Sequence, residues 1–72
     1  MPEEIRVKLD EANKLIEVGV RKITELQNEI ARLEREGRDT AHVRARLAEW
    51  HALQLQFLAE QTQLRVQQVR TQ

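Results

Sequence analysis

The sequence predicts an all-α protein, an antiparallel hairpin of two helices. Apolar residues recur every seven positions in both halves of the 72-residue chain, and one glycine-containing turn separates the halves. A chain of this length forms one small domain, expected over residues 1–72. Such a domain hides only about 60% of its unfolded surface, so its stability alone is marginal.

The first helix is expected over about residues 3–36. Pro2 suits the first helical turn, because its missing N–H has no helical partner to lose there, and Glu3 and Glu4 lie at the positive end of the helix dipole. Apolar residues fill the seam of a heptad repeat, and charged residues fill the opposite face. The seam residues are Ile5, Leu9, Ala12, Ile16, Gly19, Ile23, Leu26, Ile30 and Leu33.

The turn is expected at residues 37–39. Gly37 suits the left-handed position that ends a helix, and either Asp39 or Thr40 can accept the free N–H groups that open the next helix. A helix end followed directly by a helix start makes the two helices antiparallel neighbours.

The second helix is expected over about residues 40–69, with a half-polar seam. Gln54, Gln61 and Gln68 are expected to edge this seam and to fix its register through hydrogen bonds across the helices. The alternative is that the glutamine-rich stretch 54–72 forms a binding surface for nucleic acid or protein. The seam residues are Val43, Leu47, Trp50, Gln54, Phe57, Gln61, Leu64 and Gln68.

A second apolar stripe lies on the side of this helix away from Trp50. A two-helix hairpin covers only one face of each helix, so we expect the hairpin to dimerise into a four-helix bundle that covers both faces. The stripe consists of Ala41, Ala48, Ala52, Leu55, Ala59 and Val66.

Counting outward from the turn predicts which residues face each other. The numbers of facing residues are expected to sum to about 77, within two. Ile30 then faces Leu47, and Gly19 faces Phe57. Because glycine costs about 1 kcal/mol in a helix interior relative to alanine, we expect that Gly19 is present to leave room for the Phe57 ring.

The residues expected to form the core and the oligomer interface come from both seams and from the second stripe. They are Leu9, Ile16, Gly19, Ile23, Ile30, Leu47, Trp50, Leu55, Phe57 and Leu64.

The sequence predicts no catalytic, cofactor-binding or metal-binding residue. The chain has no Ser, Cys or Tyr, and its two glycines cannot form a phosphate-binding loop. The paired carboxylates lie on the outward face of the first helix, whereas general acid–base catalysis uses groups in a dry cleft. His42 and His51 are nine residues apart, on opposite sides of one helix. We therefore expect a non-enzymatic protein without a cofactor.

Charge and hydropathy narrow the expected partners. Twelve basic and twelve acidic residues give a net charge of zero, which argues against nucleic acid and against an anionic membrane surface. No stretch approaches the roughly 18 consecutive apolar residues of a membrane span, and residues 1–10 contain no apolar run typical of a signal peptide. The expected location is the cytoplasm, and the expected partner is a second copy of the chain.

The expected function is that of a small protein-interaction or scaffolding module acting as a homodimer. One alternative is a regulatory hairpin dimer that binds RNA, whose affinity would fall steeply with salt because phosphate contacts release counterions. The other is a subunit or inhibitor that docks a different protein through the second helix. A folded monomer at micromolar concentration would favour this last alternative.

The turn and its flanks read Ile30-Ala-Arg-Leu33-Glu34-Arg-Glu-Gly37-Arg-Asp39-Thr40-Ala41, followed by Ala45, Leu47 and Ala48. This stretch resembles a group of short, uncharacterised helical-hairpin proteins from proteobacteria. The resemblance covers about residues 20–58 and implies a helical hairpin but no particular activity. The topology is also similar to that of a plasmid-encoded antiparallel hairpin dimer that binds paired RNA loops, and this likeness extends to no individual residue.

Overall fold

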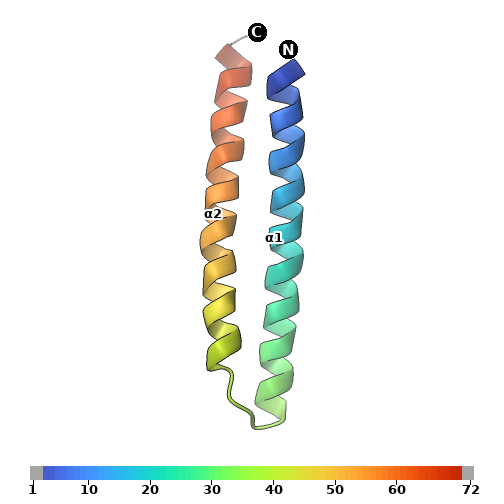
Figure 1. Cartoon of the computed structure of the whole chain (residues 1–72), viewed down its shortest axis with the longest axis vertical. Helices are drawn as coiled ribbons and strands as arrows, with labels where there is room; N and C mark the ends of the chain where they lie inside the picture. The colour runs from blue at the N-terminus through green and yellow to red at the C-terminus, as the bar shows by residue number, and fades with distance from the viewer. Residues whose placement is uncertain (1–2, 71–72) are drawn as a thin grey trace.

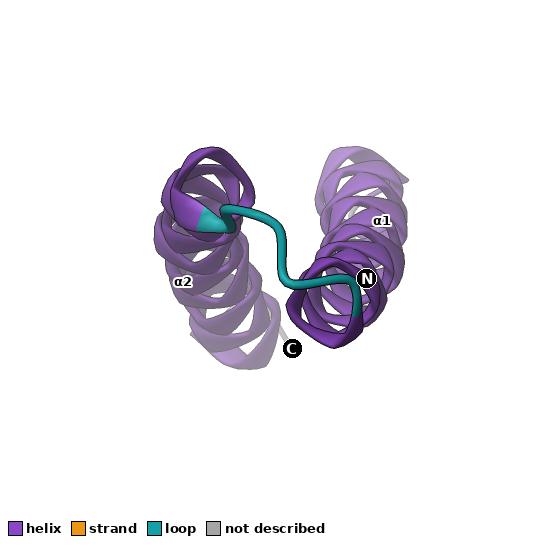
Figure 2. Ribbon diagram, turned by 90° about the horizontal axis from the view of Figure 1, so that it is seen from below, coloured by secondary structure: helices purple, strands orange, loops and turns teal. Residues whose placement is uncertain are grey.

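A computed structural model describes residues 3–70, which form two antiparallel helices, α1 (Glu3–Arg35) and α2 (Ala41–Arg70). The predicted all-α hairpin is confirmed, and both helices begin and end within one residue of the expected positions. The described hairpin measures 55 × 14 × 12 Å, and the start of α1 and the end of α2 lie at the same end of the rod (Figure 1). Viewed along the rod, the helices lie side by side and the connecting loop joins their near ends (Figure 2).

Gly37 ends α1 as the sequence predicts. Its φ of 69° is a left-handed conformation that L side chains rarely adopt. The Arg38 N–H donates to the Leu33 carbonyl at 2.9 Å, and the Gly37 N–H donates to the Glu34 carbonyl at 3.1 Å. This pair of bonds is the Schellman motif, which satisfies two carbonyl groups at the end of the helix.

Asp39 caps the start of α2, which decides between the two expected capping residues. Its Oδ1 accepts the Ala41 N–H at 3.0 Å, while the Thr40 carbonyl accepts the Arg44 N–H at 2.9 Å. The Thr40 hydroxyl instead accepts a hydrogen bond from Arg44 Nε, and Arg44 Nη2 reaches Glu34 Oε1 at 2.9 Å. Arg44 therefore ties the first turn of α2 to the last turns of α1.

The core lies between the helices along the two predicted seams. Every seam position of both helices within residues 3–70 is buried or half-buried. The best-packed part lies near the turn, where Leu47 and Trp50 pack against a buried cluster. That cluster consists of Leu26, Ile30, Leu33 and Val43. Farther from the turn, Ala12 and Leu64 are also buried.

The register differs from the predicted one. Gly19 lies opposite Gln54 rather than Phe57, so facing residue numbers sum to 73 and not to about 77. Residues 38–40 are non-helical. Extended chain advances about 3.3 Å per residue against about 1.5 Å in a helix. Figure 1 shows that this segment runs back alongside the end of α1 before α2 begins. The prediction assumed a helical rise for every residue counted from the turn, so α2 is shifted along α1 relative to the predicted register.

The prediction that Gly19 leaves room for Phe57 is therefore wrong, because the neighbouring side chain is Gln54. A Cβ at Gly19 would overlap the Gln54 amide, with Gln54 Cδ 2.6 Å away. The bare backbone lets Gln54 Nε2 cross the seam and donate to the Ile16 carbonyl at 3.0 Å. Gly19 makes room for an amide, not for an aromatic ring.

A second glutamine also bonds across the seam. Gln61 Nε2 donates to Asn13 Oδ1 at 2.6 Å. Together with the Gln54 bond, this contact fits the predicted role of the seam glutamines in fixing register.

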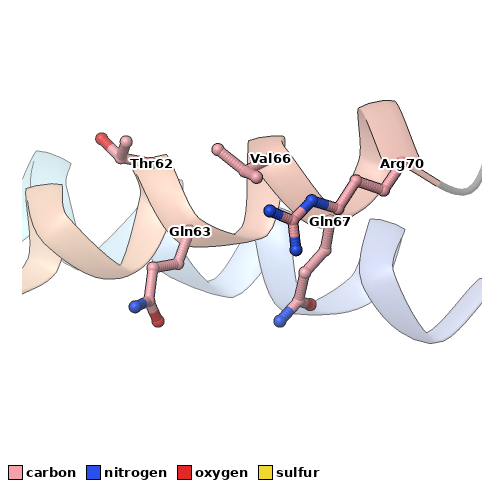
Figure 3. Close-up of a pocket in the computed structure, with 5 residues that line it drawn as sticks. All are labelled: Thr62, Gln63, Val66, Gln67 and Arg70. Atoms are coloured by element: carbon pink, nitrogen blue, oxygen red, sulfur yellow. The ribbon is translucent and has the colours of Figure 1, made fainter.

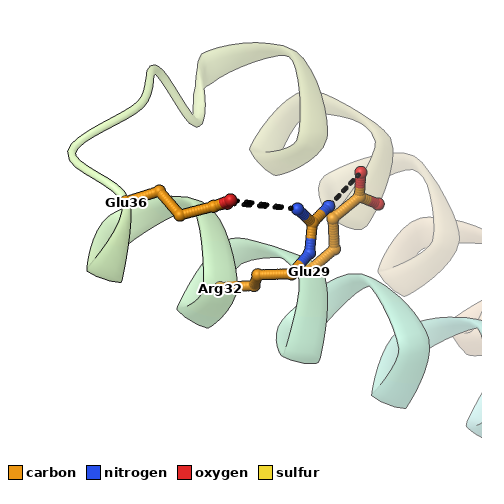
Figure 4. Close-up of polar contacts among 3 residues, drawn as sticks. All are labelled: Glu29, Arg32 and Glu36. Atoms are coloured by element: carbon orange, nitrogen blue, oxygen red, sulfur yellow. Dashed lines mark hydrogen bonds and ion pairs between the residues drawn. The ribbon is translucent and has the colours of Figure 1, made fainter.

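The ion pairs lie on the exposed surface of the hairpin. Arg32 lies between Glu29 of α1 and Glu36 of the turn, with Nη1 3.2 Å from Glu36 and Nη2 3.9 Å from Glu29 (Figure 4). Pairs this exposed contribute between zero and about 1 kcal/mol each. Packing along the seam, rather than surface charge, therefore holds the hairpin together.

Candidate interaction surface

The surface with the clearest capacity for binding is the face of α2 that points away from α1. We call it the outward face of α2. Its residues follow the alternating three-and-four spacing of a heptad seam over the whole helix, and all of them are uncharged and exposed. They are Ala41, Ala45, Ala48, Ala52, Leu55, Ala59, Thr62, Val66 and Val69.

The larger apolar residues of this face are strongly solvated in the single chain. Leu55 is 69% exposed, Val69 is 71% exposed and Val66 is 45% exposed. A helix on the surface of a globular protein normally carries one apolar stripe, which faces its core. The outward face is thus a second stripe that the hairpin leaves uncovered.

Polar and charged residues flank the outward face. One flank carries Glu49, Gln56, Gln63 and Arg70, all of which are exposed. Within residues 3–70, neither Glu49 nor Arg70 takes part in an ion pair. Glu60 of the same helix lies about three turns from Arg70, which is too far for a contact. Charges of both signs therefore stand free beside the apolar stripe.

The outward face is hollowed near its C-terminal end. A shallow depression of about 310 Å³ lies over Thr62 and Val66. Figure 3 shows the Arg70 guanidinium turned back along the helix toward Val66 and Gln67 at this place. A small side chain from another molecule would fit there next to a free positive charge.

A second depression lies on α1. It has a volume of about 380 Å³ and is lined by Ile16, Glu17, Val20 and Arg21. Val20 is 54% exposed, so this surface adds a smaller apolar patch near the middle of the rod.

The structure separates the predicted interface residues into two groups. Leu55 lies on the outward face. The other nine lie between the helices, buried or half-buried: Leu9, Ile16, Gly19, Ile23, Ile30, Leu47, Trp50, Phe57 and Leu64.

Sequence reasoning missed three members of the outward face, Ala45, Thr62 and Val69. A helical projection at 100° per residue gathered only the centre of the stripe. The missing signal is the heptad spacing itself, because counting three and four residues from Ala41 reaches every member.

The histidines and acidic residues of the described part of the chain do not form a metal site. His42 and His51 are both exposed, and no three His, Cys, Asp or Glu residues among 3–70 are grouped so that they could hold a metal ion. Neither described helix is long and apolar enough to cross a membrane. No protein-family model, curated protein or solved structure matches the chain.

Proposed function

We propose that the protein is a small, non-enzymatic interaction or scaffolding module that acts as a homodimer of helical hairpins. The observation that carries the proposal is the uncovered outward face of α2, with Leu55 and Val69 about 70% exposed. Contiguous apolar surface of this kind marks sites where proteins associate. A chain this small also gains core from a partner, which offsets its thin interhelical packing.

Thermal unfolding at several protein concentrations tests the proposal. Because a dimer is favoured by mass action, the melting temperature of the wild-type protein should rise over a roughly 100-fold increase in concentration. A melting temperature that does not change with concentration would contradict a homodimer.

Two matched variants locate the contact. Leu55→Glu places a charge in the proposed interface and should make the melting temperature independent of concentration. Thr24→Glu adds the same charge to an exposed position of α1 and should leave the concentration dependence intact. If both variants behave alike, the outward face is not the contact surface.

A different protein that docks on the outward face is the competing function. It predicts a wild-type hairpin that stays monomeric and folded at micromolar concentration. The same melting series therefore separates the two functions.

A further inference from the structure

We infer that the outward face of α2 packs against the outward face of α2 in a second copy, with the two helices antiparallel. This inference rests on the proposed function and adds the arrangement of the two chains. Three features of the outward face support it: its side-chain sizes, its flanking charges and its depression.

The side-chain sizes change along the outward face. Its N-terminal half contains only alanine, at Ala41, Ala45, Ala48 and Ala52, whereas the C-terminal half contains the larger Leu55, Thr62, Val66 and Val69. An antiparallel copy sets the large half against the small half, which packs both at one helix separation. A parallel copy sets large against large and alanine against alanine, so the helices would splay.

One register matches these sizes over eight layers. It places each large residue of one copy opposite an alanine of the other, in heptad layers like those between α1 and α2. The layers set Leu55 opposite the partner's Ala59, Thr62 opposite the partner's Ala52, Val66 opposite the partner's Ala48 and Val69 opposite the partner's Ala45.

The flanking charges agree with the same register. It brings Glu49 beside the partner's Arg70, and Arg70 beside the partner's Glu49. Relative to the facing residues of the register, Glu49 and the partner's Arg70 are offset along the helices as Glu34 and Arg44 are across the hairpin seam. The Glu34–Arg44 ion pair measures 2.9 Å. Neither Glu49 nor Arg70 has an ion-pair partner within the described residues of one chain. The two free charges are therefore complementary in a dimer.

The depression over Thr62 and Val66 receives the partner in this arrangement. The partner's Ala48 and Ala52 pass over it, and the partner's Glu49 approaches the Arg70 guanidinium that borders it (Figure 3). Because alanine side chains are small, the partner's helix can come close enough to fill the shallow depression.

The arrangement also fixes the shape of the dimer. The seam and the outward face lie on opposite sides of α2, so the four helices form a row: α1, α2, the partner's α2 and the partner's α1. A square bundle would instead need two apolar faces about 90° apart on each helix. This inference replaces the expected four-helix bundle with a single layer of four helices.

Chemical cross-linking tests the arrangement, and the chain has no native cysteine to interfere. In the antiparallel register Gln56 lies near the two-fold axis, so a Gln56→Cys protein should be joined into a covalent dimer by a short bismaleimide. An Ala45→Cys protein should not, because its two thiols are about 36 Å apart along the helices. Mixing Ala45→Cys with Val69→Cys should restore cross-linking.

The outcomes distinguish the arrangement from the proposed function. Equal cross-linking of Ala45→Cys and Gln56→Cys would show a parallel pair and overturn the inference. A protein that sediments as a dimer while Gln56→Cys stays unlinked would also overturn it and leave the homodimer standing. A monomer in both measurements would overturn both.

A charge swap tests the register independently of cross-linking. Glu49→Arg alone and Arg70→Glu alone each bring like charges together and should lower the dimer association constant several-fold at low salt. The double variant restores opposite charges and should recover most of the wild-type association. If the double variant binds as weakly as the two losses combined, these residues do not meet.

Discussion

Gln54 crosses from α2 to α1 and lays its amide over Gly19, where any Cβ would collide with it. The amide nitrogen has a partner in the Ile16 carbonyl, but the buried Oε1 has none. A buried polar atom without a partner costs about 1–3 kcal/mol. This contact therefore specifies which residues face each other, at some expense in stability.

Filling the space above Gly19 should destabilise the hairpin. A Gly19→Leu chain gains about 1 kcal/mol of helix propensity but displaces Gln54 and overpacks the seam, which costs about 1–3 kcal/mol. We expect a net loss of about 1 kcal/mol and a lower melting temperature in circular dichroism. A higher melting temperature would show that the seam has room to spare.

Removing the Gln54 amide should have the opposite effect. Gln54→Leu deletes the unpaired Oε1 and adds apolar volume to the seam, while the Ile16 carbonyl keeps its own helical hydrogen bond. We expect urea unfolding to show a gain of about 1 kcal/mol. A loss of similar size would mean that the amide contributes more through its bond to Ile16 than its unpaired oxygen costs.

At the scale of the elements, each helix depends on its seam and its ends. The heptad spacing predicted both seams, and the glycine and aspartate at the turn predicted where α1 ends and α2 begins. The register could not be predicted by counting, because the advance of residues 38–40 depends on their backbone conformation rather than on their number. The wrong prediction that Gly19 faces Phe57 follows from the conformation of residues 38–40.

The end of α1 gives a direct test of the turn. Gly37→Ala forces an L side chain into a left-handed conformation at φ 69°, although no atom outside the local chain crowds the position. The strain should lower the free energy of unfolding by about 1 kcal/mol.

Arg38→Ala is the matched control for the turn. It keeps the backbone N–H bond to Leu33 and should change stability by less than about 0.5 kcal/mol. Equal losses in the two variants would assign the effect to side-chain contacts instead of glycine.

At the scale of the whole molecule, the hairpin is a thin rod with one covered face per helix. Sequence periodicity predicted that α2 carries more apolar surface than α1 can cover, and two residues of the predicted stripe, Leu55 and Val66, are indeed exposed. Periodicity could not place the second copy, because packing between chains depends on side-chain size and flanking charge at a register that only the hairpin structure defines. The proposed function therefore depends on the oligomeric state of the protein.

Sedimentation equilibrium at low micromolar concentration measures that state most directly, with helicity recorded on the same samples. We predict a highly helical species of about twice the 8.5 kDa chain mass, which dissociates on dilution. A compact, fully helical species of single-chain mass throughout the concentration range would contradict it.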